Sequence, residues 1–446
     1  MNGAATFPGS QVIWAVLTAT LLRFGWLLVR GPELTFPDEE RFWCAALSWA
    51  NGGQIGCGEK IAHDMPLTAL LAGTVVQIAG PNLWATKLAT ASLSALTVIP
   101  CALIAWRITH ERMAAVLAAY GFAVYPFSIY YSALLLSETL FLLCLTSVMV
   151  VVTALCAQPR SFDTPMQRMA WGVGLGVTCG LAHLTRPTLM YFLPVLLLWV
   201  PLAARRSWWI PVIAVICALA ITLPWIVRNH DAFGHILPGT LGVGQVLLEG
   251  NTPLNSTGGV LSPNAGYLRD LPPGLNELER DDWKRKRALV HIREAPQRFL
   301  ALAWRKALRL WNIVPNAKQF RTPLYRWISI VSFGPVVVLA ALFPFLTPSS
   351  WRLWTPVLLL VGYVTAVHMV TIGSIRYRLP LEPTLLALAA GSVSILALKY
   401  RKHRGLAADP NRPVGLVAGS ASRGMKPTGQ PSKDTQPDGA AHKPPS

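Results

Sequence analysis

Long apolar runs recur along most of the 446-residue chain, and they restrict its fold more than any other feature. A run of about 18 or more apolar residues with few charges is long enough to cross a membrane as a helix. Hydrophobic residues make up 53% of the chain and charged residues only 13%, whereas soluble domains usually carry about 25% charged residues. The sequence therefore predicts an all-α polytopic membrane protein and excludes an ordinary soluble enzyme.

We predict ten membrane-spanning helices with both termini in the cytoplasm. No small-residue cleavage site follows the first one, so we interpret it as a retained helix and not as a signal peptide. Lys and Arg clusters favour the cytoplasmic side. Only a hairpin at Thr185-Arg186-Pro187 and a split at Tyr125-Pro126 leave the flanking cations on that side. The predicted spans are 11–29, 83–106, 113–127, 133–156, 169–184, 187–203, 208–226, 327–346, 353–372 and 380–398.

The remaining segments are predicted to lie beside the membrane. The apolar stretch 66–79 is too short to cross, which favours an interfacial helix. Leu300, Trp304, Leu308 and Trp311 recur at helical spacing among basic residues, which predicts an amphipathic helix on the membrane surface. We expect a membrane domain over 1–400, with outer loops near 30–82 and 227–325, and a disordered basic cytoplasmic tail over 401–446. The net charge of +18 suits anionic lipids. No nucleic-acid-binding module is recognisable.

Two cysteines of the seven, Cys44 and Cys57, fall together in the first predicted outer loop. In an oxidising periplasm they could pair as a disulfide, and two free thiols are the alternative. Gly172, Gly176 and Gly180 form two overlapping GxxxG spacings, which close packing of helices explains without any chemistry.

Unusual polar residues gather on the outer face of this predicted topology. Charged side chains at membrane depth are costly and usually mark a functional cavity. Arginine forms bidentate hydrogen bonds with phosphate, and a nearby carboxylate can deprotonate a hydroxyl group. Together they predict sugar transfer from a polyprenyl-phosphate donor, whereas a single arginine could equally be an interfacial anchor. The residues are Asp38, Glu39, Lys87, Glu138, Arg186, Arg228, Asn229, Arg376 and Arg378.

These residues lie in motifs that resemble the GT-C polyprenyl-phosphate-dependent glycosyltransferases, the group of protein O-mannosyltransferases and lipid A aminoarabinose transferases. The resemblance spreads over residues 10–400, and the order and spacing of the motifs carry it. The motifs are Phe36-Pro37-Asp38-Glu39, Tyr125-Pro126, Leu136-Ser137-Glu138-Thr139-Leu140-Phe141, Gly180-Leu181-Ala182-His183-Leu184-Thr185-Arg186-Pro187, Pro224-Trp225-Ile226-Val227-Arg228-Asn229, Glu249-Gly250-Asn251-Thr252-Pro253, Thr257-Gly258-Gly259 and Arg376-Tyr377-Arg378-Leu379-Pro380.

The resemblance implies a GT-C-like bundle of about ten helices and a role for each matching residue. Asp38 would be the catalytic carboxylate, and Glu39 would support it through contact with the acceptor or a metal. The donor phosphate and substrate positions would be Lys87, Glu138, Arg186, Arg228, Asn229, Asn251, Arg376 and Tyr377.

One departure from the family weakens the aminoarabinose assignment. Those transferases carry a Lys-Pro-Pro-Leu segment where this chain has Asp64-Met65-Pro66-Leu67. His63 could supply the missing cation, or it could be an ordinary loop histidine. No spacing of His63, His183, His230 and His235 is typical of a metal site. No cofactor is predicted, and a divalent metal is left open.

The sequence thus predicts an inverting glycosyltransferase of the cell inner membrane. It would move a sugar from a polyprenyl-phosphate donor to a hydroxyl group of a lipid, glycan or protein acceptor on the periplasmic face. A transporter or flippase of a lipid-linked sugar is one alternative, although it would not need Asp38-Glu39 and no internal repeat is found. A non-catalytic subunit that binds polyprenyl phosphate is the other.

Overall fold

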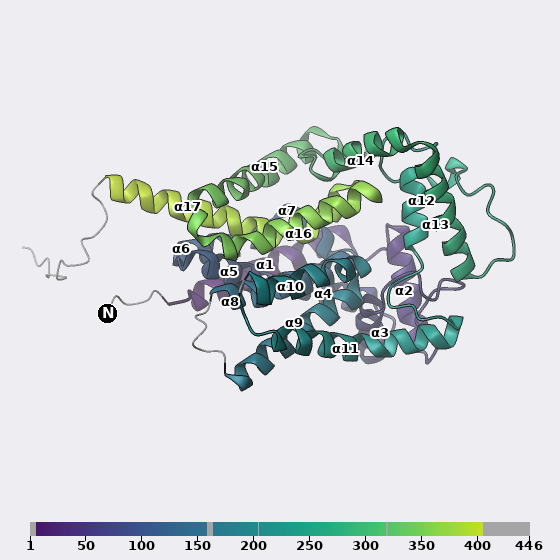
Figure 1. The fold of residues 1–446 in the computed structure, drawn as a ribbon, viewed down its shortest axis with the longest axis horizontal. Helices are drawn as coiled ribbons and strands as arrows, with labels where there is room; N and C mark the ends of the chain where they lie inside the picture. The colour runs from purple at the N-terminus through teal and green to yellow at the C-terminus, as the bar shows by residue number, and fades with distance from the viewer. Residues whose placement is uncertain (1–5, 158–163, 204, 318–319, 405–446) are drawn as a thin grey trace, which may run out of the picture. The chain divides into compact units, whose positions relative to one another are not determined.

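The computed structural model describes residues 6–157, 164–203, 205–317 and 320–404, and this part of the chain is helical without a strand (Figure 1). Residues up to Tyr400 belong to one compact unit. The helices are α1 (Gly9–Arg30), α2 (Pro37–Ala50), α3 (Leu67–Ala79), α4 (Leu83–Leu96), α5 (Val98–Thr109), α6 (Arg112–Ala123), α7 (Pro126–Ser132), α8 (Ser137–Ala157), α9 (Pro165–Thr185), η2 (Pro187–Tyr191), α10 (Leu193–Leu202), α11 (Trp209–Phe233), α12 (Val243–Asn251), η3 (Pro263–Ala265), α13 (Glu277–Glu294), α14 (Pro296–Leu310), α15 (Pro323–Leu346), η5 (Pro348–Ser350), α16 (Trp351–Val370), η6 (Ile375–Leu381) and α17 (Glu382–His403).

Within the described ranges, seven helical segments are long and apolar enough to cross a membrane, or eight if the bent pair α6–α7 counts as one span. The prediction of a polytopic all-α membrane protein is confirmed. The count of ten exceeds this number because two predicted spans belong to the hairpin at Arg186. There, α10 has only 10 residues, and α9, with 21 residues, is not among the segments that are apolar enough.

The hairpin at Arg186 is present. Arg186 follows the last residue of α9, and its side chain reaches Ser137 and Glu138 at the start of α8. After α10 the chain is back at the other end of α8, where the Arg206 side chain donates a hydrogen bond to the Leu155 carbonyl (2.8 Å). The segment η2–α10 therefore runs back along the length of α8.

Glycines set the packing of α9 against α11. A Cβ atom on Gly176 would lie 2.5 Å from the Ala214 carbonyl oxygen, and one on Gly180 would lie 3.0 Å from the Ile221 Cβ atom. Gly176 contacts Ala214 and, further along both helices, Gly180 contacts Ile221, so α9 and α11 run parallel. The GxxxG spacings are explained by close helix contact, as predicted.

The split predicted at Tyr125-Pro126 needs a correction. Pro126 begins α7, and α6 and α7 meet there at a bend of 48°. The bend follows from proline, which lacks an N–H group to continue the hydrogen-bond ladder of the preceding helix. The turn between the two predicted spans therefore lies further along the chain, at residues 133–136 between the end of α7 and the start of α8 at Ser137.

Arg23 of α1 is buried and stabilises this bend. Its guanidinium donates to the carbonyl oxygens of Phe122 and Ala123 at the end of α6, and to the hydroxyl groups of Ser94 and Ser128. A buried arginine is tolerated when its donors are paired in this way.

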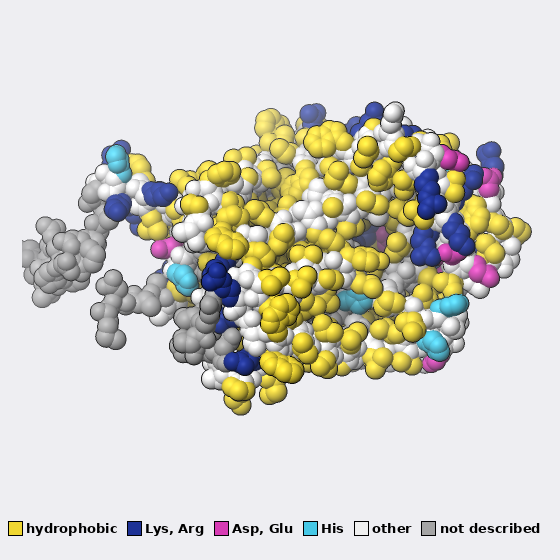
Figure 2. Space-filling view, in the orientation of Figure 1, with side chains coloured by type: hydrophobic (Ala, Val, Ile, Leu, Met, Phe, Trp, Pro, Cys, Tyr) yellow, Lys and Arg dark blue, Asp and Glu magenta, His cyan; other side chains and the backbone are white. Residues whose placement is uncertain are grey.

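Three helices that are too polar or too short to cross, α2, α12 and α13, gather at one end of the compact unit (Figure 1). Figure 2 shows Lys and Arg side chains clustered at this end, next to a broad hydrophobic surface over α9, α11 and α15. The predicted amphipathic helix is α14, with Leu300, Trp304 and Leu308 exposed along one side. The predicted tail, 401–446, lies outside the described residues apart from 401–404 at the end of α17.

Candidate functional site

The start of α2 fixes the position of Asp38. Pro37 occupies the first helical position, and the Glu39 carboxylate accepts hydrogen bonds from the Thr35 and Phe36 backbone N–H groups (3.0 and 3.3 Å). Asp38 therefore lies in the first turn, where the helix dipole stabilises a negative charge.

An uninterrupted row of ion pairs joins Asp38 to residues far away in the sequence. Nη1 of Arg376 in η6 lies 2.8 Å from an Asp38 oxygen, and the Nε atom of Arg376 donates to Glu138 at the start of α8. Arg186 donates to the same Glu138 oxygen (2.6 Å) and also bonds the Ser137 hydroxyl (3.0 Å). The structure thus brings together four predicted site residues, Asp38, Glu138, Arg186 and Arg376.

Three donors at this cluster make no hydrogen bond within the described part of the chain: Nη1 of Arg186, Nη2 of Arg376 and the Tyr377 hydroxyl. The guanidinium of Arg186 lies 5.9 Å from the centre of the Tyr377 ring, and the His368 ring stacks on that ring with its centre 4.5 Å away. Free donors on two cations and a hydroxyl suit an anion with several oxygens, such as a phosphate.

The charge state of Asp38 follows from its two arginine neighbours. Burial alone would raise the pKa of Asp38, but the charges of Arg376 and Arg41 outweigh burial and lower it to about 2. The carboxylate is therefore ionised at neutral pH. An outer-loop carboxylate also lies within electrostatic reach of Asp38: burial raises the pKa of Glu249 in α12, and the Asp38 charge raises it further.

Glu39 and Lys87 are predicted to act in the site, but the structure buries both side chains in the helix bundle, away from the free donors of Arg186 and Arg376. Their side chains are fully buried and form an ion pair of 2.8 Å. Lys87 also bonds the Glu33 carbonyl, and Glu39 accepts from the backbone N–H of Leu135 (2.9 Å), three residues before Glu138. The pair connects α2, α4 and the segment before α8, so its position suits alignment of Asp38 with Glu138.

Three other predicted residues have contacts away from the row of ion pairs. Arg228 bonds Asn229 (3.0 Å) and the Ile55 carbonyl (2.8 Å), and the Asn229 amide donates to the Leu237 carbonyl. Asn251 is buried and joins α12 to the Lys306 ammonium and the Val370 carbonyl. These side chains hold the loops after α2 and α11 and the end of α12 in place. A role for them in substrate binding stays a prediction.

Two important residues were missed by the sequence analysis, Arg41 and Asp64. Arg41 lies one turn after Asp38 on α2 and contacts it at 3.1 Å, and both Asp64 oxygens accept from Arg41. The only sequence signal for Arg41 is its i, i+3 spacing from Asp38. His63 does not supply the missing cation at neutral pH, because burial lowers its pKa to about 4.

The described residues contain no group of three or more His, Cys, Asp or Glu side chains arranged to hold a metal ion. Both Asp38 oxygens contact guanidinium groups in this structure.

An apolar groove has lining residues three positions before and three positions after Arg186 in the sequence, His183 and Leu189. It is formed by α9, η2, α10 and α11, and η2 begins directly after Arg186. Leu189, Leu193, Ala218 and Leu219 are among its lining residues, and His183 and Thr222 are its few polar ones.

Fold and site together define the class of protein as a polytopic membrane protein with the GT-C fold. The structure is similar to the oligosaccharyltransferase of Archaeoglobus fulgidus in its apo form, with 13% identity, a TM-score of 0.57, and coverage of 89% of this chain and 51% of that chain. It is also similar to the archaeal oligosaccharyltransferase AglB from the same organism in complex with an inhibitory peptide and a dolichol-phosphate, with 13% identity, a TM-score of 0.56, and coverage of 92% and 53%. ArnT from Cupriavidus metallidurans bound to undecaprenyl phosphate has 16% identity, a TM-score of 0.44, and coverage of 91% and 82%.

Residues 63–227 match the model of the dolichyl-phosphate-mannose-protein mannosyltransferase family. The predicted resemblance to the GT-C glycosyltransferases is confirmed. The chain spans about half the length of the archaeal oligosaccharyltransferase. No curated protein sequence matches it.

Proposed function

We propose that this protein is a membrane glycosyltransferase that moves a sugar from a polyprenyl-phosphate donor to a hydroxyl acceptor. The observation that carries the proposal is the convergence of free donors from Arg186, Arg376 and Tyr377 beside the ionised Asp38 carboxylate. The family match and the dolichol-phosphate complex of a protein with the same fold support a lipid-linked donor.

The donor phosphate would bind Arg186 and Arg376, and its lipid chain would follow the apolar groove. That groove starts within one helical turn of Arg186, since Leu189 and Met190 line it. The phosphate would compete with Glu138 and Asp38 for the two guanidinium groups. Charge-assisted hydrogen bonds of this kind are stronger than neutral ones.

In the proposed reaction, the acceptor oxygen attacks the anomeric carbon of the sugar and its proton passes to Asp38. The bond from that carbon to the phosphate oxygen breaks, and the phosphate leaves with the electron pair, stabilised by the two arginines. One displacement inverts the configuration at the sugar carbon. A base with a pKa of about 2 is weak. A phosphate that engages Arg376 would raise the Asp38 pKa because it removes part of the charge that holds it low.

The disulfide Cys44–Cys57, which the structure shows formed, supports a site on the periplasmic face of an inner membrane. It joins α2, the helix of Asp38, to the loop that follows. Disulfides persist in oxidising compartments and are rare in the cytosol.

The test uses purified protein in nanodiscs with undecaprenyl-phosphate-linked mannose, glucose or arabinose, and follows release of undecaprenyl phosphate. A glycosyltransferase should release the carrier only when an acceptor extract of the cell envelope is present, and label should appear in the acceptor. Carrier movement between leaflets without bond cleavage would favour the transporter. Binding without cleavage or movement would favour a non-catalytic subunit.

A further inference from the structure

We infer that Arg41, fixed by Asp64, is a positioning residue that keeps Asp38 oriented while Arg376 engages the donor. The inference rests on the proposed function. It begins with the two arginines that hold Asp38: Nη1 of Arg376 lies 2.8 Å from one carboxylate oxygen and Nη1 of Arg41 lies 3.1 Å from the other.

These two arginines differ in what else they hold. Arg376 is shared with Glu138, and its free Nη2 belongs to the set of donors beside the site. Arg41 makes no contact with that set. Its Nε and Nη2 atoms donate to the two oxygens of Asp64, with 3.1 Å for the second bond. A phosphate that draws Arg376 away from Asp38 would therefore leave Arg41 in place.

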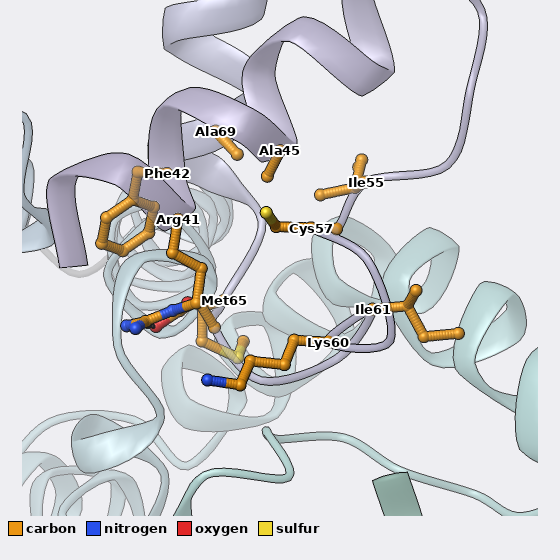
Figure 3. Close-up of a pocket in the computed structure, with 11 residues that line it drawn as sticks. Arg41, Phe42, Ala45, Ile55, Cys57, Lys60, Ile61, Met65 and Ala69 are labelled. Carbon is orange, nitrogen blue, oxygen red and sulfur yellow. Dashed lines mark hydrogen bonds and ion pairs between the residues drawn. The ribbon is translucent and has the colours of Figure 1, made fainter. Parts of the chain in front are cut away.

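Asp64 is itself held by several outer elements. The loop before it is joined to α2 by the disulfide Cys44–Cys57, and Glu277 of α13 accepts from the Ile61 and Ala62 backbone N–H groups (2.8 and 3.0 Å). Figure 3 shows Arg41, Cys57 and Lys60 around one small crevice, and Asp64 also lines this crevice. The backbone of Arg41 is fixed in α2 and its guanidinium is fixed by Asp64, so the side chain loses little entropy when it orients the Asp38 carboxylate.

The groups around Asp38 predict how its titration depends on Arg41. Arg41 on α2 and Arg376 on η6 lower the Asp38 pKa, and Glu249 on α12 opposes them. With Arg376 engaged by phosphate, Arg41 would be the main remaining group that keeps Asp38 ionised. Removing it should raise the Asp38 pKa towards its ordinary value and leave the carboxylate free to rotate.

The experiment measures release of undecaprenyl phosphate against pH from 4 to 8 for wild type, Arg41→Gln, Arg41→Lys and Asp64→Asn. Arg41→Gln should lower kcat about 10-fold, leave the donor KM within about twofold, and lose activity below about pH 5 where wild type does not. Arg41→Lys keeps the charge without the fork, so kcat should fall with little change in the pH profile. Arg280→Gln is the matched control, because Arg280 pairs with Glu59 of the same loop at 2.7 Å and does not touch Asp38.

A lower kcat in Arg41→Gln with a wild-type pH profile would overturn the inference, because loss of structure alone would explain it. A rise in donor KM equal to the fall in kcat would also overturn it and would place Arg41 in donor binding. If wild type neither binds undecaprenyl phosphate nor cleaves any of the three donors, the proposed function fails, and the inference fails with it.

Discussion

Arg186 and Arg376, 190 positions apart in the sequence, donate hydrogen bonds to the same oxygen of Glu138. The other Glu138 oxygen is buried and accepts no hydrogen bond from the residues that the structure describes. A buried carboxylate between two guanidinium groups holds them side by side despite their repulsion. Among the described residues, each arginine has one terminal nitrogen without a hydrogen bond. Glu138 therefore holds two cations close together, where an anion that binds them more strongly could displace it.

The first prediction concerns this pair of cations. Arg186→Ala and Arg376→Ala should each weaken binding of undecaprenyl phosphate about 10- to 100-fold, because each loses charge-assisted hydrogen bonds worth about 1.5–3 kcal/mol. Lysine at either position should restore binding only in part, since it keeps the charge and loses the fork. Binding to protein in nanodiscs is the measurement. Unchanged affinity in both alanine variants would exclude a phosphate site here, and Arg280→Gln controls for the loss of an outer cation.

The second prediction concerns orientation in the membrane. Reporter fusions after Arg206 and after Arg404 should be cytoplasmic, and a reporter inserted in 254–262 should be periplasmic. The physical reason is the bias of Lys and Arg towards the cytoplasm. A periplasmic signal after Arg206 would contradict this orientation, because the hairpin α9–η2–α10 returns that residue to the end of α8 opposite Arg186.

Hydropathy and charge bias were enough to predict the helical bundle and the turn at Arg186, because both depend on local composition. They could not predict the bend at Pro126, where the chain continues as α7 before it turns. The ordered motifs named Asp38, Glu138, Arg186 and Arg376, which the fold brings together. Glu39 and Lys87 differ from these four residues because their side chains are fully buried. The motifs do not indicate this burial, because it results from the packing of the whole helix bundle. Arg41 and Asp64 were missed because their pairing joins segments 23 residues apart.

The third prediction concerns the contact between α9 and α11. Gly176→Ala should destabilise the protein by about 1–3 kcal/mol, because the added methyl group would lie 2.5 Å from the Ala214 carbonyl oxygen and overpack the contact. It should also weaken donor binding, since α9 carries Arg186 at its end. Gly174→Ala is the matched control, with no atom within 4 Å of its new methyl group. Thermal unfolding in detergent measures both variants, and equal melting temperatures would contradict the close packing.

The fourth prediction concerns pH and the contact between α12 and α13. Burial raises the pKa of Asp281 to about 6, although its carboxylate accepts a hydrogen bond from the Gly244 backbone N–H (2.8 Å). Because the pKa of Asp281 is higher in the folded protein than the unfolded value of 3.8, the protonated side chain favours the folded state. This contribution to the free energy of unfolding is complete below pH 3.8 and is lost as the pH rises through about 6.

Asp281→Asn removes the charge and keeps an oxygen for Gly244. It should therefore stabilise the protein at pH 7.5 by about 1 kcal/mol and flatten the dependence of the melting temperature between about pH 4 and pH 6.5. Asp282→Asn is the control, because that neighbouring carboxylate pairs with Arg285 and Lys286 at the surface. A destabilised Asp281→Asn protein at pH 7.5 would show that the charged form is the favourable one.

The last prediction separates Asp38 from Glu39. Asp38→Asn keeps the size and the acceptor oxygen of the side chain but cannot take the acceptor proton, so turnover should fall by about 10²- to 10⁴-fold. Binding of undecaprenyl phosphate should be kept or tightened, because the Asp38 charge no longer competes for Arg376. Glu39→Gln should act differently, because it leaves the fully buried Lys87 ammonium without its counter-charge. Breaking a buried ion pair costs about 3–5 kcal/mol, so this variant should lose thermal stability together with donor binding. Near-native turnover in Asp38→Asn, beside a stable but inactive Glu39→Gln, would move the proton acceptor to Glu39. Near-native turnover in both would remove general-base catalysis by this loop and favour a protein that moves a lipid-linked sugar without cleaving it.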